Sequence, residues 1–232
     1  MRGFSRIKTK KSAQSAASFM RSNMKIGIIG TGNVGSALGK GWASQGHEVV
    51  FGTRQPEREK VQEMLKEVGG GSTAVSIPTA IQQSEIIVIA TPWNAVSDVA
   101  HAVSDWQGKI VIDATNPIAP GFQLAVGHTT SAAEQLATFL PGAKVVKAFN
   151  STGAENMADP SYDGEPTTMF ICGDDAEAKA TVTELAESLG FDVADVGGLE
   201  AARFIEPLAM VWINLAIKQG LGRNIAFKLV RR

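Results

Sequence analysis

The chain has 232 residues, of which 44% are hydrophobic and 19% are charged, and its formal net charge is −1. This length suits one large α/β domain with or without a small helical extension, and the near-neutral charge argues against a nucleic-acid partner. The single cysteine and three scattered histidines offer no disulfide or metal-ligand spacing, and no apolar run approaches the roughly 20 residues that span a membrane.

Residues 1–23 contain six basic side chains, several serines and no acid. Acid-free termini rich in Arg and Ser are typical of organelle transit peptides. Met24 stands directly before the first apolar run, which favours a disordered tail or a start codon assigned too early. We therefore expect a cytoplasmic protein, with an organellar location as the alternative if this segment is a transit peptide.

The first strong pattern is an apolar run over 26–29, followed by a glycine-rich turn and an amphipathic helix over 36–43. A strand, then G-x-G-x-x-G, then a helix indicates dinucleotide binding. Gly30 allows the tight turn, Gly32 lets the backbone approach a pyrophosphate, and Gly35 lets the helix pack closely on the strand. The alternative is a glycine-rich turn that binds nothing.

The end of the second expected strand, 47–52, indicates which dinucleotide is bound. An Asp or Glu here would bond the ribose 2′-OH of NAD. The chain instead has Thr53 and Arg54, with Arg58 one helical turn further on. A hydroxyl and a guanidinium suit a 2′-phosphate, so the pattern favours NADP(H) over NAD(H). The alternative is that both arginines are solvated loop charges beside neighbouring glutamates.

Apolar strands and amphipathic helices continue through the chain, and strand 85–90 has the unbroken apolar run of a parallel strand buried on both faces. We predict a doubly wound Rossmann sheet. The expected helices are 57–68, 78–84, 94–105, 131–140 and 174–189; the expected strands are 73–77, 85–90, 109–114, 144–149, 168–173 and 191–196, with an irregular loop over 117–129.

Ligands of open α/β sheets bind at the carboxyl ends of the strands. Thr91 and Pro92 follow strand 85–90, and Trp93 either packs beside the ligand or caps the next helix. Asn116 follows strand 109–114 and is a candidate for orienting the cofactor carboxamide, unless it only forms an Asn-Pro turn. The capping-box helix at 131–134 starts on the same side. The expected substrate contacts are Pro117, Ser131, Asn150 and Ser151.

The segment 199–217 is strongly apolar and contains Pro207, which either kinks one helix or separates two. Its apolar side chains surround most of the helix, so we expect burial on more than one side and a homodimer interface. Asn214 and Lys218 share a helix face; we favour an interface Asn and a solvated Lys over a catalytic pair. Cys172 is expected to be a packed small hydrophobe.

Six motifs together make the chain resemble the F420-dependent NADP oxidoreductase family from Met24 to about the C-terminus: GTGNVG, GTR, TPW, SAAE, KVVKAFN and GGLEAARFIEPLAMVW. The architecture also resembles the cytosolic reductase domain of the six-transmembrane metalloreductases, which passes hydride from NADPH to a flavin. The composition predicts a disordered tail over 1–23, and the resemblance implies an NADP-binding Rossmann domain over 24–198 and a helical segment over 199–232 that contributes to the substrate pocket and a dimer.

The resemblance further implies that hydride passes directly between stacked rings, so no catalytic acid or base is expected. Residues 31–34 would hold the pyrophosphate, the 2′-phosphate would contact Arg54, and the nicotinamide ribose would lie along Thr91. The expected cofactor site comprises Gly30, Thr31, Gly32, Asn33, Val34, Gly35, Thr53, Arg54, Arg58, Thr91, Pro92, Trp93 and Asn116.

The family pattern leaves the second substrate open. Archaeal members that use the deazaflavin have a His where this chain has Asn150. We expect an oxidoreductase that moves hydride between NADP(H) and a small-molecule acceptor, either F420 or a flavin (FMN or FAD). The alternatives are an NADP-dependent dehydrogenase or imine reductase acting on a small carbonyl or imine, and a non-catalytic NADP(H)-binding sensor.

Overall fold

The computed structural model describes residues 23–232, so the expectations for the basic N-terminal tail at residues 1–22 lie outside the described residues. The strands are β1 Lys25–Ile29, β2 Glu48–Gly52, β3 Thr73–Val75, β4 Ile86–Ile89, β5 Ile110–Asp113, β6 Ile118–Ala119, β7 Gln123–Leu124, β8 Lys144–Lys147, β9 Ser161–Tyr162, β10 Glu165–Pro166, β11 Thr168–Gly173 and β12 Asp192–Asp195. The helices are α1 Asn33–Ser44, α2 Glu59–Val68, α3 Ile77–Gln83, α4 Val96–Ala100, α5 Ala132–Phe139, α6 Ala176–Ser188 and α7 Ala202–Ile213. Four short helical turns are η1 Trp93–Ala95, η2 Ala154–Asn156, η3 Leu199–Ala201 and η4 Asn214–Lys218.

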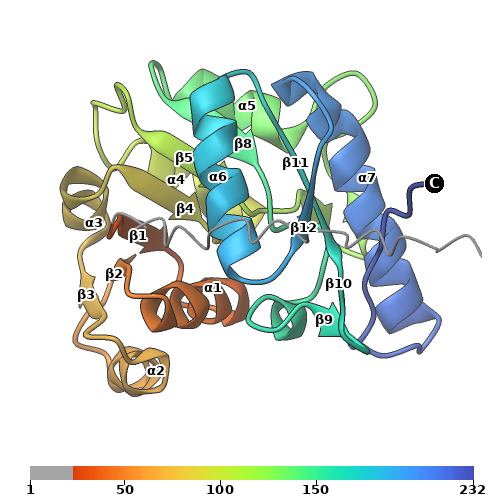
Figure 1. Ribbon diagram of the computed structural model, residues 1–232. Coiled ribbons are helices and arrows are strands. Elements are labelled where there is room, and N and C mark those ends of the chain that lie inside the picture. The colour runs from red at the N-terminus through yellow and green to blue at the C-terminus, as the bar shows by residue number, and fades with distance from the viewer. Residues whose placement is uncertain (1–22) are drawn as a thin grey trace, which may run out of the picture.

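Within the described chain, eight strands form one sheet in the order β12-β11-β8-β5-β4-β1-β2-β3 (Figure 1). All pairs from β3 to β8 are parallel. β11 runs antiparallel to β8, and β12 runs parallel to β11. The six parallel strands have the order of a doubly wound dinucleotide-binding sheet, which confirms the predicted Rossmann fold.

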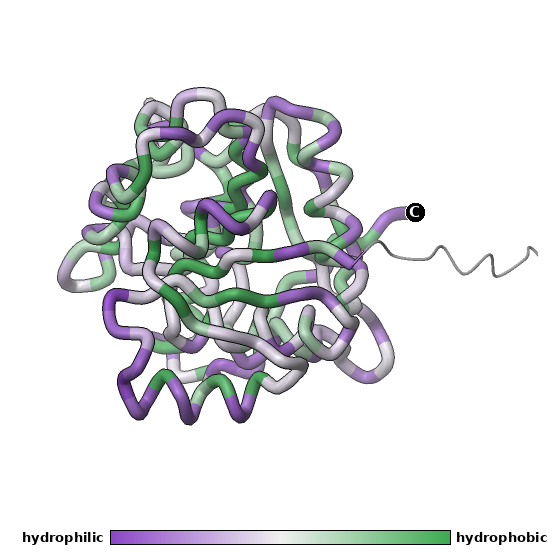
Figure 2. Tube along the Cα trace, turned by 90° about the vertical axis from the view of Figure 1, so that its left-hand side faces the viewer, coloured by the Kyte–Doolittle hydropathy of each residue, from purple (hydrophilic) through white to green (hydrophobic). Residues whose placement is uncertain are grey.

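Helices cover both faces of this sheet. Side chains of α1, α2 and α6 pack on one face, and those of α3, α4, α5 and α7 pack on the other. Figure 2 shows hydrophobic residues along the central strands and hydrophilic residues on the outer turns. The four residues of β4 are all buried, as their unbroken apolar run predicts for a strand covered on both sides.

Short polar side chains determine where several helices begin. The backbone N–H of Thr79 donates to Ser76 Oγ (3.4 Å) at α3, and that of Ala178 donates to Asp175 Oδ1 (2.8 Å) at α6. At α5 the N–H of Glu134 donates to Ser131 Oγ (3.1 Å), so the predicted start of this helix is confirmed. Each bond satisfies one of the N–H groups that a helix start leaves open.

Two predictions of local structure were wrong. The helix expected over 94–105 ends at Ala100, because the indole N–H of Trp106 donates to the Ala100 carbonyl (3.0 Å) and fixes the chain in a turn. The loop 117–129 contains the antiparallel β6–β7 hairpin. Pro207, for which the sequence left two alternatives open, lies inside the continuous helix α7, so it does not separate two helices.

Cys172 is fully buried in β11, with its Sγ 3.8 Å from the Leu199 carbonyl oxygen. Burial raises the pKa of this thiol to about 12, so the side chain stays protonated near neutral pH. The prediction of a packed, unreactive thiol is confirmed. No helix within residues 23–232 is both long and apolar enough to cross a bilayer.

Candidate cofactor-binding site

The β1–α1 turn has the geometry that its three glycines predict. Gly30 has a φ of 129°, and a Cβ there would lie 2.4 Å from the Ala90 carbonyl oxygen. A Cβ on Gly35 would lie 2.2 Å from the Gly30 carbonyl oxygen, so α1 packs against the turn only because this side chain is absent. A Cβ on Gly32 would meet nothing within 4 Å, which leaves space at the mouth of the turn for a ligand.

The start of α1 is open to an anion. Gly32 occupies the N-cap position, no side chain caps the helix, and its first turn contains no acid. The free N–H groups and the positive end of the helix dipole therefore point to the space beside Gly32. This is the arrangement that binds a pyrophosphate in dinucleotide-binding proteins.

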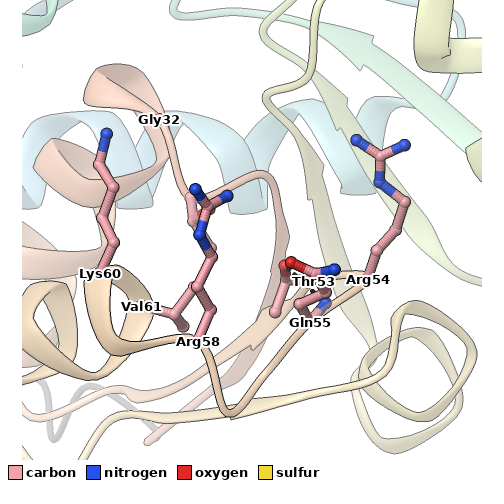
Figure 3. A pocket seen from close by; sticks show the side chains of 8 residues that line it. Gly32, Thr53, Arg54, Gln55, Arg58, Lys60 and Val61 are labelled. Atoms are coloured by element: carbon pink, nitrogen blue, oxygen red, sulfur yellow. Dashed lines mark hydrogen bonds between the residues drawn. The ribbon is translucent and has the colours of Figure 1, made fainter.

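A pocket of about 600 Å³ joins this turn to the end of β2 (Figure 3). Arg58 and Lys60 rise from the start of α2 on one side, and Arg54 stands on the other side of Thr53 (Figure 3). The structure thus brings together the predicted residues Thr31, Gly32, Thr53, Arg54 and Arg58. Three further residues that the sequence pattern did not indicate, Gln55, Lys60 and Val61, also line the pocket.

The three cations of this pocket have no partner of opposite charge in the described part of the chain. Within residues 23–232, Arg54, Arg58 and Lys60 form no ion pair with a carboxylate. All three side chains belong to exposed residues, so solvent keeps the cost of their unpaired charge small. Together they create a positive potential that suits a phosphate group better than a ribose hydroxyl.

A second set of predicted residues lies at the carboxyl ends of β4, β5 and β8. The Asn116 amide donates to the Asn150 carbonyl oxygen (2.9 Å), and the Asn150 amide donates to Asn116 Oδ1 (3.1 Å). The side-chain oxygens of Thr91 and Asn150 are buried without a hydrogen-bond partner in the part of the chain that the structure describes. Buried polar atoms are normally satisfied, so these two orphan acceptors fit a site that a polar ligand completes.

Backbone strain occurs directly before Asn150. Phe149 is fully buried and has a φ of 61°, a value that bulky residues rarely adopt. Its ring packs edge-on against Trp42 and Phe191, and its N–H donates to Met169 Sδ (3.1 Å). Such strain persists only where surrounding packing enforces it, and it is common at functional sites. The packing of Phe149 therefore fixes the direction in which the chain enters Asn150.

Four further predicted site residues are buried or partly buried. Trp93 packs partly against the hydrophobic core, as in the alternative in which it only covers the following helix. Pro117 and Ser151 are buried. Ser131 is also buried, and its hydroxyl donates to Glu134 Oε2 (2.7 Å). Its side chain is thus occupied within the protein.

A buried ionic cluster was not anticipated from the sequence. Lys147, Asp113 and Glu206 have fully buried side chains, and the Lys147 ammonium lies 2.9 Å from Asp113 Oδ2 and 3.1 Å from Glu206 Oε1. Burial alone would lower the pKa of Lys147, but the two carboxylates outweigh it, so this pKa lies above its ordinary value. The available signal was the presence of charged residues at the ends of the apolar strands IVID and KVVK.

Comparisons with known proteins agree with this geometry. The family model described as "NADP oxidoreductase coenzyme F420-dependent" matches residues 25–117. The F420-dependent NADP reductase of Methanothermobacter marburgensis is 33% identical over 229 residues, covering 89% of this chain and 98% of the relative. The chain belongs to the F420-dependent NADP oxidoreductase family. It is therefore an oxidoreductase that uses NADP(H).

Two further relatives bear on this assignment. A candidate F420-dependent NADP reductase from Arthrobacter sp. FB24 has a crystal structure that aligns with a TM-score of 0.82 at 34% identity, covering 90% of this chain and 100% of the other. The metalloreductase STEAP3 of Rattus norvegicus is 34% identical over 187 residues, or 80% of this chain. The chain spans only 36% of that protein's length.

Two glycine substitutions should separate folding from cofactor binding. Gly35→Ala forces a Cβ onto the Gly30 carbonyl and should destabilise the protein by about 1–3 kcal/mol, as overpacking does. Gly32→Ala meets no atom and should leave the free energy of unfolding within about 0.5 kcal/mol of wild type. It should nevertheless weaken NADPH binding by roughly tenfold or more, because the Cβ occupies the pyrophosphate approach.

Thermal unfolding without ligand and titration calorimetry with NADPH measure the two effects. Lys40→Ala, an exposed position on α1, is a control that should change neither quantity. If Gly32→Ala binds NADPH as tightly as wild type, the pyrophosphate does not lie at this turn.

Proposed function

We propose that this oxidoreductase moves hydride between NADP(H) and F420 or a flavin acceptor, with the nicotinamide at the carboxyl edge of β4, β5 and β8. The observation that carries the proposal is the pocket between the β1–α1 turn and the start of α2, where three unpaired cations surround Thr53. NADPH supplies the hydride from its nicotinamide ring, and the protein supplies position and electrostatics.

The adenosine half of the cofactor is assigned to this pocket. The pyrophosphate binds the free N–H groups of residues Thr31 to Gly35 at the start of α1. The 2′-phosphate accepts hydrogen bonds from Thr53 and from the charged ends of Arg54, Arg58 and Lys60. Lys60 adds a positive charge to the two arginines that the sequence pattern indicated, which strengthens the preference for NADP(H).

The nicotinamide half is assigned to the crevice formed by the loops after β4, β5 and β8. Thr91 and Pro92 lie along the nicotinamide ribose, and the amide of Asn116 orients the carboxamide. Asn150 Oδ1, buried and unsatisfied, is the acceptor that a ligand amide or ring N–H completes. Pro117 and Ser151 are assigned to the acceptor side, with Trp93 at its margin, whereas the Ser131 hydroxyl is already bonded to Glu134.

The names of the relatives support the acceptor class. They include F420-dependent NADP reductases and metalloreductases. Hydride transfer between two flat rings needs no acid or base at the reacting carbon. The two unsatisfied groups of the crevice, the Thr91 hydroxyl and the Asn150 side-chain oxygen, fit that requirement because neither is an acid or a base near neutral pH. Asn214 and Lys218, the candidate pair for acting on a substrate carbonyl, are exposed on η4, so we do not favour that alternative.

We also propose a homodimer through α7. Phe204 is 72% exposed and Val211 is 49% exposed, seven residues apart on one face of the helix. Ile217 and Leu221, beyond the end of α7, are also exposed apolar residues. A two-fold axis lets one such stripe cover the same stripe of a second copy, which removes apolar side chains from water on both chains.

Removing the cations should change cofactor preference. Lys60→Ala and Arg58→Ala should each weaken NADPH binding by roughly thirtyfold, since a charged hydrogen bond contributes about 2 kcal/mol. Binding of NADH, which lacks the 2′-phosphate, should stay within about twofold. Calorimetric titration of both nucleotides measures this, with Lys66→Ala as the matched control on the exposed face of α2. Equal affinity of the wild type for NADPH and NADH would contradict the assignment.

An acceptor screen tests the reaction itself. With NADPH as donor, turnover followed by the loss of nicotinamide absorbance should occur with F420, FMN or FAD and not with small ketones or imines. Efficient reduction of a ketone or imine would support the dehydrogenase alternative. Tight NADPH binding without turnover on any of these compounds would support a sensor.

Charge placed on the α7 stripe should separate the dimer. Phe204→Asp and Val211→Asp each bury a carboxylate in the proposed interface, which is strongly unfavourable. Light scattering after size exclusion should give twice the chain mass of 24.5 kDa for wild type and one chain mass for the variants. A wild-type protein with the mass of one chain would contradict the dimer.

A further inference from the structure

The buried ionic cluster lies directly before the two loops that form the nicotinamide crevice. Asp113 is the last residue of β5, Lys147 is the last residue of β8, and the two are paired in register in the sheet. Asn116 lies three residues after Asp113, and Asn150 lies three residues after Lys147. Glu206 reaches the same point from α7.

The cluster holds Thr115 at three atoms. The Lys147 ammonium donates to the Thr115 carbonyl oxygen (2.8 Å) as well as to the carboxylates of Asp113 and Glu206. These three acceptors use all of its hydrogens. Asp113 Oδ1 accepts the Thr115 backbone N–H (2.9 Å) and hydroxyl (2.7 Å). The residue before Asn116 is therefore fixed by side chains from two strands.

The same ammonium connects this loop to two helices. The Glu206 carboxylate accepts the backbone N–H groups of Ala132 (2.9 Å) and Ala133 (3.0 Å) at the start of α5. The dipole of α5 favours an anion at this end. Because Glu206 belongs to α7, the cluster fixes α7, the start of α5 and the loop after β5 relative to one another.

The side chains of Asn116 and Asn150 are held by two segments that the cluster fixes, the loop after β5 and α7. Asn116 follows Thr115 and is joined to Asn150 by two hydrogen bonds. The Asn150 amide also donates to the carbonyl of Ile205 (3.4 Å), the residue before Glu206. A displacement of either Thr115 or α7 therefore moves the two side chains that face the nicotinamide.

We propose that Lys147 is a positioning residue for hydride transfer: with Asp113 and Glu206 it holds the β5 loop and α7 in the one arrangement that presents Asn116 and Asn150 to the nicotinamide. The inference rests on the proposed function, which places that ring in the crevice. Buried ion pairs can often be replaced by apolar groups with little loss of stability. These directional bonds fix the positions of the crevice residues. Position matters because small misplacements of reacting groups slow a reaction strongly.

The test is the double variant Lys147→Met/Asp113→Asn. It removes one positive and one negative charge, so the net charge of the cluster stays the same, and Glu206 keeps its two bonds to α5. Lys179→Met, which breaks a partly buried ion pair between α6 and Asp195 at the end of β12, is the matched control for loss of a lysine.

Two measurements distinguish positioning from a role in folding. Calorimetry should give an NADPH dissociation constant within about threefold of wild type, because the phosphate pocket is intact. The emission lifetime of the bound reduced nicotinamide should fall toward that of free NADPH, and single-turnover oxidation should slow by at least about tenfold. The control should change neither. An unchanged lifetime and rate in a folded double variant would overturn the proposal.

A second variant covers the case in which the first does not fold. Lys147→Met/Asp113→Asn/Glu206→Gln removes all charge from the cluster and should give the same loss of lifetime. Failure of both variants to fold would assign the cluster to stability and overturn the proposal. Absence of NADPH binding by the wild type would instead refute the proposed function, because the lifetime measurement needs only bound cofactor.

Discussion

The contact between Gly35 and the carbonyl of Gly30 is the constraint on which the site depends. Only the absence of a side chain allows α1 to approach the end of β1 so closely. This approach aims the uncapped start of α1 at the space beside Gly32, and it places that space next to the end of β2. The parallel order of the sheet then brings the loops after β4, β5 and β8 to the same edge.

Charge is used in two different ways along this edge. At the adenosine end the cations of the pocket are exposed and unpaired, so they remain available to a phosphate. At the other end Lys147 is buried, and all its hydrogens are taken by the protein. The exposed cations can bind a phosphate, because an unpaired charge is tolerated in water. The buried Lys147 instead holds neighbouring segments in place, because a charge in the core has to be paired.

The sequence predicted what depends on local chemistry. The glycine turn and the capping serine of α5 have the geometry that the sequence predicts, and Arg54 and Arg58 line one pocket with Thr53. Each of these features depends on contacts within a few residues of its position. The length of α4 depends on Trp106, six residues beyond its end. The cluster around Lys147 joins residues 34 to 74 positions apart. Contacts of that range leave no periodic signal in the sequence, so the cluster could not be predicted. Lys60, in contrast, lies only two residues after Arg58 and could have been included from the sequence.

A crystal structure of the complex with NADP⁺ tests the central claim most directly. The account predicts the 2′-phosphate within about 3 Å of charged nitrogens of Arg58 and of Arg54 or Lys60, the distance of a hydrogen bond. It predicts the carboxamide against Asn116 and Asn150, with the pyrophosphate beside Gly32. A 2′-phosphate in open solvent, or a nicotinamide ring outside the crevice of β4, β5 and β8, would contradict it.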